Sequence, residues 1–225
     1  MTNHLMFSNR YHKSSGPKFV ILLMLVFAIG IAAWMIFLNP ETAVSNGNLY
    51  RQTILIMCGF IYLTRLVFTM FVFLRRRISW PEVLPISVLM SLALYGFIYI
   101  GGIKAQPLNI MDLTGMVLYL AGSVINTVSE LKRHRWKSRP KNQGYLYTGG
   151  LFKRVRHINY FGDILLFFGF ALITQDLRAL YIPLFMALNF VFILIPAKEA
   201  YLKNKYGDEF EEYSHRSKKV IPLIY

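Results

Sequence analysis

Residues 19–38, FVILLMLVFAIGIAAWMIFL, decide the fold class, because they form a run of twenty residues without a charge. A helix needs about 20 apolar residues to cross the hydrocarbon core of a bilayer. Five more runs of similar length carry no charge or only one: 52–74 (with Arg65), 83–101, 110–129 (with Asp112), 158–175 (with Asp163) and 179–197. The sequence therefore predicts an all-α, multi-pass membrane helix bundle with about six transmembrane helices, since lipid tolerates only helices and closed barrels.

The basic residues are distributed unevenly around these runs. If the N-terminus is cytoplasmic, the inner segments hold 21 of the 25 Lys and Arg residues, nine of them in residues 131–157, whereas the outer loops hold three. This bias follows the positive-inside rule. It predicts that both termini are cytoplasmic, in a bacterial inner membrane or the endoplasmic reticulum. It also accounts for the net charge of +14 without nucleic-acid binding.

Charge density divides the chain into two predicted parts. Residues 1–129 hold four spans with short links and are the candidate substrate side, whereas residues 130–225 alternate two spans with two polar segments. These polar segments, 130–157 and 198–225, are expected to meet as a cytoplasmic cap. In the second one we expect a helix that ends at Gly207 and a short amphipathic helix over residues 208–216.

The cysteine and histidine content limits the chemistry. The chain has one cysteine, Cys58, and five histidines without ligand spacing. A disulfide framework within the chain is excluded, and no metal site is expected.

Cations cluster where the fifth span begins, in KRVRHINYFGD at residues 153–163. A helix N-terminus carries positive partial charge, so added cations are favourable there only beside an anion, and phosphate is the usual one. Ordinary anchoring of the span in the cytoplasm explains the same charges. The spacing of Arg156, Tyr160 and Asp163 puts them on one helix face. Such a face predicts either a cavity wall or a buried arginine–aspartate contact between helices.

Two other polar features are weaker candidates. Glu199 follows the last span, and together with Arg216 it is a candidate to cap a cofactor, although the tail also fits a solvated face. Arg65 lies near the middle of the second span, where a charge needs a partner or water. It is therefore a candidate for orienting a substrate.

Several short strings along residues 129–225 together resemble one membrane superfamily. This superfamily holds the steroid 5-alpha reductases, the delta-14 sterol reductases and the isoprenylcysteine carboxyl methyltransferases. The strings, in chain order, are GGLF at 149–152, RHINYFGD at 156–163, KYG at 205–207, Tyr213, Arg216 and IPLIY at 221–225.

Details of the resemblance favour the reductases. They share the Asn-Tyr-x-Gly-acid string at residues 159–163 and the stretch at 144–152. The methyltransferases share the Arg-His pair, the tyrosine and the tail glutamate, but they typically carry two glutamates where this chain has Lys198 and Glu199. Both groups usually have a proline where this chain has Ile158.

The resemblance implies a reductase that uses NADPH on a carbon–carbon double bond of a lipid, sterol or steroid-like substrate in the bilayer. It implies catalytic roles for Tyr160 and Asp163. Arg65 lies outside the resembling region and joins them as a predicted catalytic residue because of its place in the second span. The implied cofactor-binding residues are Arg139, Lys141, Asn142, Arg154, Arg156, His157, Asn159, Glu199, Tyr206, Tyr213 and Arg216.

Two alternatives remain open at this point. One is a methyltransferase that uses S-adenosylmethionine on a lipid-linked acceptor, with the basic residues binding the methionine carboxylate. The other is a lipid-binding membrane protein without catalysis, in which Arg156 and Asp163 only join helices. The sequence leaves the oligomeric state open.

Overall fold

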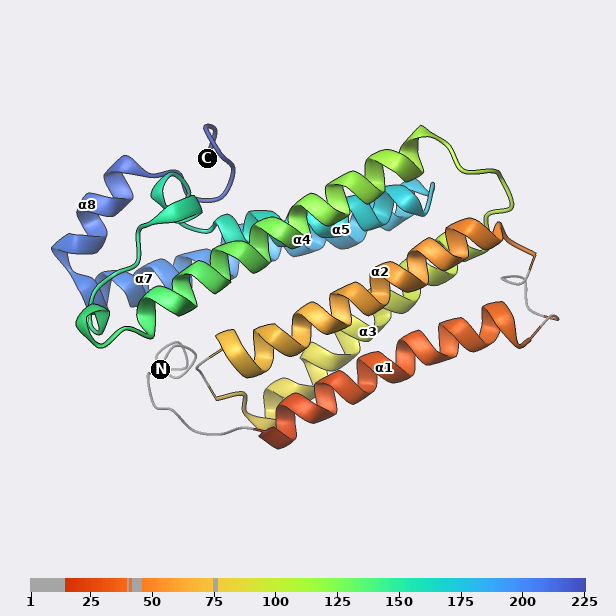
Figure 1. Ribbon diagram of the computed structural model, residues 1–225, viewed down its shortest axis with the longest axis horizontal. Coiled ribbons are helices and arrows are strands. Elements are labelled where there is room, and N and C mark those ends of the chain that lie inside the picture. The colour runs from red at the N-terminus through yellow and green to blue at the C-terminus, as the bar shows by residue number, and fades with distance from the viewer. Residues whose placement is uncertain (1–14, 40, 42–45, 75–76) are drawn as a thin grey trace. The chain divides into compact units, whose positions relative to one another are not determined.

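The computed structural model describes residues 15–39, 41, 46–74 and 77–225 (Figure 1). Within these residues every regular element is a helix, and an isolated parallel bridge joins Val155 to Lys218. The chain forms two units. The described residues of the bundle unit lie within 15–120 and 167–183, and those of the cap unit are 121–166 and 184–225. Four cations that contribute to the charge bias lie outside the described residues: Arg10, Lys13, Arg75 and Arg76.

Five helical segments of the described chain are long and apolar enough to cross a membrane. They are α1 (Ser15–Phe37), α2 with the π-helix η1 (Leu49–Phe68, Thr69–Phe73), α3 (Trp80–Gly102), α4 (Ile110–Lys137), and the run Leu177–Tyr206. The remaining predicted span, the fifth along the chain, is the apolar helix α5 (Ile158–Ile173), whose 16 residues extend about 24 Å at helical rise. The predicted multi-pass bundle is confirmed, with five full-length spans rather than six.

The last long segment contains several helical types. It runs through the 3₁₀-helix η4 (Leu177–Leu180), α6 (Tyr181–Asn189), the π-helix η5 (Phe190–Leu194) and α7 (Ile195–Tyr206). Gly207, with φ of 51°, ends α7, as predicted. The next helix, α8 (Asp208–Arg216), buries Phe210 and Tyr213, so the predicted amphipathic helix is confirmed.

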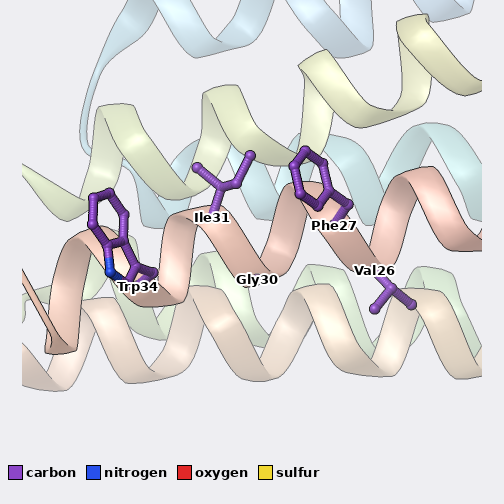
Figure 2. A pocket seen from close by; sticks show the side chains of 5 residues that line it. All are labelled: Val26, Phe27, Gly30, Ile31 and Trp34. Carbon is purple, nitrogen blue, oxygen red and sulfur yellow. The ribbon is translucent and has the colours of Figure 1, made fainter.

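Helix α1 shows how the bundle unit sorts its side chains. Its buried residues, such as Ile21, Leu25 and Ile29, recur at helical spacing and face α2 and α3. Its other side exposes large apolar residues, which suits contact with lipid. An apolar notch of about 370 Å³ opens along this helix beside Gly30, and it is lined by Val26, Phe27, Gly30, Ile31 and Trp34 (Figure 2). All five lining residues belong to α1 and none is charged, so the notch offers no group for chemistry.

A buried ion pair closes one end of the bundle unit. Arg51 and Asp112, which are 0% and 1% exposed, meet through Nε–Oδ1 at 2.8 Å and Nη2–Oδ2 at 3.1 Å. Arg51 also donates to the carbonyls of Lys104, Gln106 and Pro107. These five bonds occupy all five N–H groups of the guanidinium. Nearby, Lys104 pairs with Asp176 at 2.9 Å. Three loops predicted to lie on one side of the membrane are thus tied together.

Glycines let α4 and α5 approach each other to backbone contact. In the cap unit, a Cβ added to Gly122 would lie 2.4 Å from the nitrogen of Leu166. In the bundle unit, a Cβ added to Gly169 would lie 2.4 Å from the nitrogen of Tyr119. Real Cβ atoms do not approach other atoms so closely, so these glycines fix the spacing of the helix pair that carries Tyr160 and Asp163.

Candidate functional site

The start of α5 is held in place by the tail of the chain. Lys218 N donates to Arg154 O at 2.9 Å, and Lys218 O accepts from Arg156 N at 2.8 Å. The carbonyl of Lys219 accepts from His157 N at 2.9 Å. Residues 154–157 are therefore tied to the tail through their backbone, and α5 begins only at Ile158. The predicted shared helix face applies to Tyr160 and Asp163 alone, because Arg156 lies before the helix.

Arg156, His157 and Glu199 form one buried cluster. Arg156 Nε lies 2.8 Å from Glu199 Oε1, and its Nη1 donates to the carbonyls of Ser214 and Ser217 at 2.8 and 2.5 Å. His157 Nε2 lies 3.2 Å from the same Glu199 oxygen. The three side chains are 7%, 1% and 19% exposed, respectively. Arg156 therefore joins the segment before α5 to α7 and to the end of α8.

Burial keeps His157 neutral. It lowers the pKa of the imidazole to about 4, and the charges of Lys198 and Arg156 act in the same direction, whereas Glu199 opposes them. If Nε2 carries the proton, it donates to Glu199, and Nδ1 then presents a lone pair. The cluster thus sets the protonation and the orientation of this ring.

Two buried acceptors at the start of α5 lack a hydrogen bond. Within the described residues, His157 Nδ1 and Asn159 Oδ1 have no partner, although the two residues are only 1% and 6% exposed. The backbone carbonyl of Asn159, by contrast, accepts from Asn126 Nδ2 at 2.9 Å. A buried polar atom left unpaired costs about 1–3 kcal/mol. The site is therefore suited to a molecule that brings N–H or O–H donors.

Tyr160 stacks on two neighbouring rings. Its ring stacks on His157 at 5.5 Å and on Phe190 at 4.6 Å between centroids. Lys198 Nζ lies 5.0 Å from the same ring. Such ring contacts restrict the plane of the phenol.

The π-helix η5 explains how Phe190 and Lys198 both reach Tyr160. The two residues are eight positions apart, which on an α-helix separates their directions by about 80°. One extra residue in the π turn makes the spacing equivalent to about seven, so both side chains face the same way. No residue pattern signals this insertion, and Phe190 is not among the predicted site residues.

The remaining predicted residues fall into three settings. Asp163 and Arg65 are half-buried. Arg65 belongs to the bundle unit, with its guanidinium 5.4 Å from the ring of Tyr62. Four cations are exposed on the cap unit: Arg139, Lys141, Arg154 and Arg216.

Three others mainly hold the cap unit together. Asn142 Nδ2 donates to Trp136 O at 2.8 Å, and Tyr206 Oη accepts from Lys137 Nζ at 2.9 Å. Tyr213 Oη donates to Phe152 O at 2.5 Å, and burial raises its pKa.

The structure thus brings five predicted residues together: Arg156, His157, Asn159, Tyr160 and Glu199. Their roles remain predictions. Lys198 and Phe190 join them as neighbours.

Residues 83–217 match the protein family described as "Protein of unknown function (DUF1295)". The chain is a member of this family. The matched region contains every predicted site residue except Arg65.

Three similar proteins of known description divide between two chemistries. Rat (Rattus norvegicus) 3-oxo-5-alpha-steroid 4-dehydrogenase 1 is 36% identical over 115 residues, which are 50% of this chain and 41% of the relative. Steroid 5-alpha-reductase DET2 of Arabidopsis thaliana is 31% identical over 111 residues, 49% of this chain and 41% of the relative. Protein-S-isoprenylcysteine O-methyltransferase of Schizosaccharomyces pombe is 33% identical over 110 residues, 47% of this chain and 45% of the relative.

These similarities confirm the predicted resemblance to the superfamily of steroid 5-alpha reductases and isoprenylcysteine methyltransferases. The chain spans between 41% and 45% of the length of these relatives.

Proposed function

We propose that this chain is a membrane-embedded, NADPH-dependent reductase of a carbon–carbon double bond in a lipid, sterol or steroid-like substrate. The observation that carries the proposal is the pair of buried, unpartnered acceptors, His157 Nδ1 and Asn159 Oδ1, next to the stacked ring of Tyr160. They lie in the family-matched region of a chain that is similar to steroid 5-alpha-reductases.

The residues of the site fit NADPH in two respects. Its carboxamide carries N–H groups of the kind that the two acceptors require. Its phosphates suit the exposed cations Arg139, Lys141 and Arg154, because guanidinium groups bind phosphate through paired N–H donors. When bound, NADPH would supply the hydride that reduces the double bond.

The chain's own residues would supply position and a proton. Tyr160 is the proposed proton donor, since its ring plane is fixed and its phenol carries an O–H. Asp163 lies one helical turn after Tyr160, and its carboxylate is proposed to provide a polar environment for the Tyr160 hydroxyl. Arg156 and Glu199 act as positioning residues, because they fix the imidazole of His157. Arg65, in the bundle unit, is proposed to orient the substrate, and the cap unit is proposed to be cytoplasmic.

A methyltransferase that uses S-adenosylmethionine is the second candidate. The observation that favours it is the 33% identity to the isoprenylcysteine methyltransferase of S. pombe. In that case the exposed cations would bind the methionine carboxylate, and Glu199 would face a ribose or ammonium group. S-adenosylmethionine has no phosphate, so it matches the cationic cap less well than NADPH does.

Cofactor-dependent melting distinguishes these candidates. In detergent, the purified protein should melt later with NADPH, since a ligand at a hundredfold excess over its Kd stabilises the folded state by ~2.7 kcal/mol. The exposed double variant Arg139→Gln/Arg154→Gln should reduce this shift, whereas Arg178→Gln, on an exposed residue of the bundle unit, should not. A shift with S-adenosylmethionine alone would favour the methyltransferase. No shift with either would favour a lipid-binding protein without catalysis.

Turnover tests the proposed role of Tyr160. A 3-oxo-4-ene steroid is the first substrate to try, given the relatives' names, and NADPH oxidation is followed by absorbance. Loss of a general acid lowers rates by about 10²–10⁴-fold, so Tyr160→Phe should lower kcat by that range. Tyr145→Phe, an exposed control of the cap unit, should keep full activity. Equal kcat in the two variants would remove Tyr160 from the mechanism.

A further inference from the structure

The last residues of the chain form a closed, apolar knob. Val220 N and Ile221 N both donate to Tyr225 O, at 2.7 and 2.8 Å, and Tyr225 N donates back to Ile221 O at 3.1 Å. Val220, 1% exposed, roots this knob (residues 220–225) in the cap unit. Leu223, at its tip, has φ of 69°, a left-handed conformation that side chains other than glycine rarely adopt. The knob is thus a self-bonded shape rather than a loose end.

The knob presents its largest apolar side chains outward. Leu223 and Ile224 are 83% and 74% exposed, and Ile221 is 40% exposed. Cations surround its base: Lys218 is exposed, and Lys219 Nζ lies 5.1 Å from the ring of Tyr225 and donates to its hydroxyl at 3.3 Å. Exposed aliphatic tips above lysines and a tyrosine are the combination found where a segment lies in a membrane interface.

The stem of the knob, Lys218 and Lys219, lies beside the start of the apolar helix α5. Lys218 and Lys219 bond to the backbone of residues 154–157, and the apolar helix α5 begins at Ile158. These backbone hydrogen bonds place the base of the knob beside the residues that lead into α5. In Figure 1 the C-terminal segment turns away from α8 and stands clear of it.

We infer that the knob docks into the headgroup–acyl boundary of the chain's own membrane and that Lys218 and Lys219 at its base select anionic lipids. Leu223 and Ile224 would enter the acyl boundary, while Lys218 and Lys219, with Lys153 on the paired segment, would face lipid phosphates. A weak anchor suffices, because the chain already spans the bilayer and the knob therefore meets lipid at high effective concentration.

Docking would also act on the site. The stem accepts the backbone N–H groups of Arg156 and His157, so a knob held by lipid holds the segment that carries them. Because the inference rests on the knob's own exposure and position, it stands whichever cofactor the site binds.

Fluorescence in lipid nanodiscs tests the inference. Cys58, which is buried, is replaced by alanine, and Leu223→Cys is labelled with an environment-sensitive dye. A second single-cysteine variant, Gln143→Cys in an exposed loop of the cap unit, is the matched control. Phosphatidylcholine brominated near the headgroup should quench the label at 223 at least about threefold more than the label at 143, as expected for an interfacial segment.

The lipid preference is tested in the same system. Adding phosphatidylglycerol should strengthen the quenching at 223, and Lys218→Gln/Lys219→Gln should abolish that gain, whereas Lys132→Gln/Lys205→Gln, on exposed lysines elsewhere in the cap unit, should preserve it. A label at 223 that aqueous iodide quenches as readily as the label at 143 would overturn the inference. A label shielded from both lipid and iodide would also overturn it and would indicate a protein contact.

Discussion

Among the described residues, the pairs Arg51–Asp112 and Arg156–Glu199 are both shielded from solvent, and they are completed in different ways. In the bundle unit, Arg51 binds Asp112 through two bonds and three carbonyls through the rest, and Asp112 also accepts from Asn109 N and Gln175 Nε2. In the cap unit, Arg156 binds Glu199 and the tail, but the neighbouring His157 keeps an unpartnered Nδ1. Every N–H group of Arg51 has a hydrogen-bond partner, whereas the site around Arg156 keeps unpartnered acceptors.

This difference separates a structural role from a binding role. A buried charge needs a partner wherever it lies, so pairing alone says little about function. An unpaired acceptor is different, because its cost is removed only when a donor arrives. We therefore expect changes in the Arg51 cluster to alter stability alone, and changes around His157 to alter stability and ligand binding together.

The largest effect is expected from Asp112→Ala. The change leaves a guanidinium that is 0% exposed without its counter-ion, and breaking a buried pair in this way typically costs about 3–5 kcal/mol. Unfolding in detergent, followed by circular dichroism, measures the loss. Arg178→Gln removes an ion pair on a 72% exposed residue and should leave the midpoint unchanged. Equal midpoints for the two variants would contradict the structural role of the Arg51 cluster.

The pH dependence of stability should reveal His157. Its pKa is lowered from 6.5 to about 4 by burial, so between these pH values the unfolded chain binds a proton that the folded chain does not. Stability from this group is therefore complete above pH 6.5 and is lost as the pH falls, by up to about 1.4 kcal/mol per pH unit. Unfolding between pH 6.5 and 5 measures the slope.

Two variants isolate that contribution. His157→Gln should flatten the slope, because a neutral amide does not titrate, whereas His215→Gln, on an exposed residue of α8, should retain it. If His157→Gln keeps the full slope, another group is responsible and the imidazole is not held neutral by burial.

Local patterns predicted much of the fold. Uncharged runs identified the spans, and the spacing of Phe210 and Tyr213 identified α8, since both signals are contained within one helix. The basic clusters also identified the start of α5 as the place where polar groups gather, and five of the predicted site residues meet there.

What the sequence did not predict depends on contacts between distant residues. In the predicted topology Arg51 lies in an outer loop and Asp112 interrupts a span. The two residues are 61 positions apart and form one pair. The sequence signal for this pair is two opposite charges at the same predicted end of the second and the fourth span. The π turn that brings Phe190 to Tyr160 changes the phase of a helix, and that phase is set by packing rather than by residue type.

The smallest effect is expected from Lys198→Met, which removes a cation that contacts an aromatic ring. In the Arg51 cluster the cation is held by a carboxylate. Lys198 Nζ instead lies 5.0 Å from the Tyr160 ring, and a cation–π contact of this kind contributes about 0.5–1 kcal/mol. Lys198→Met should therefore cost about that amount, and a double-mutant cycle with Tyr160→Leu should recover it as a coupling energy. Because Lys198 also lowers the pKa of His157, the same variant should raise that pKa, which NMR titration of the imidazole measures. Lys141→Met, an exposed control, should change neither quantity. If the effects in the cycle are additive and the pKa of His157 is unchanged, Lys198 does not act on the rings of Tyr160 and His157.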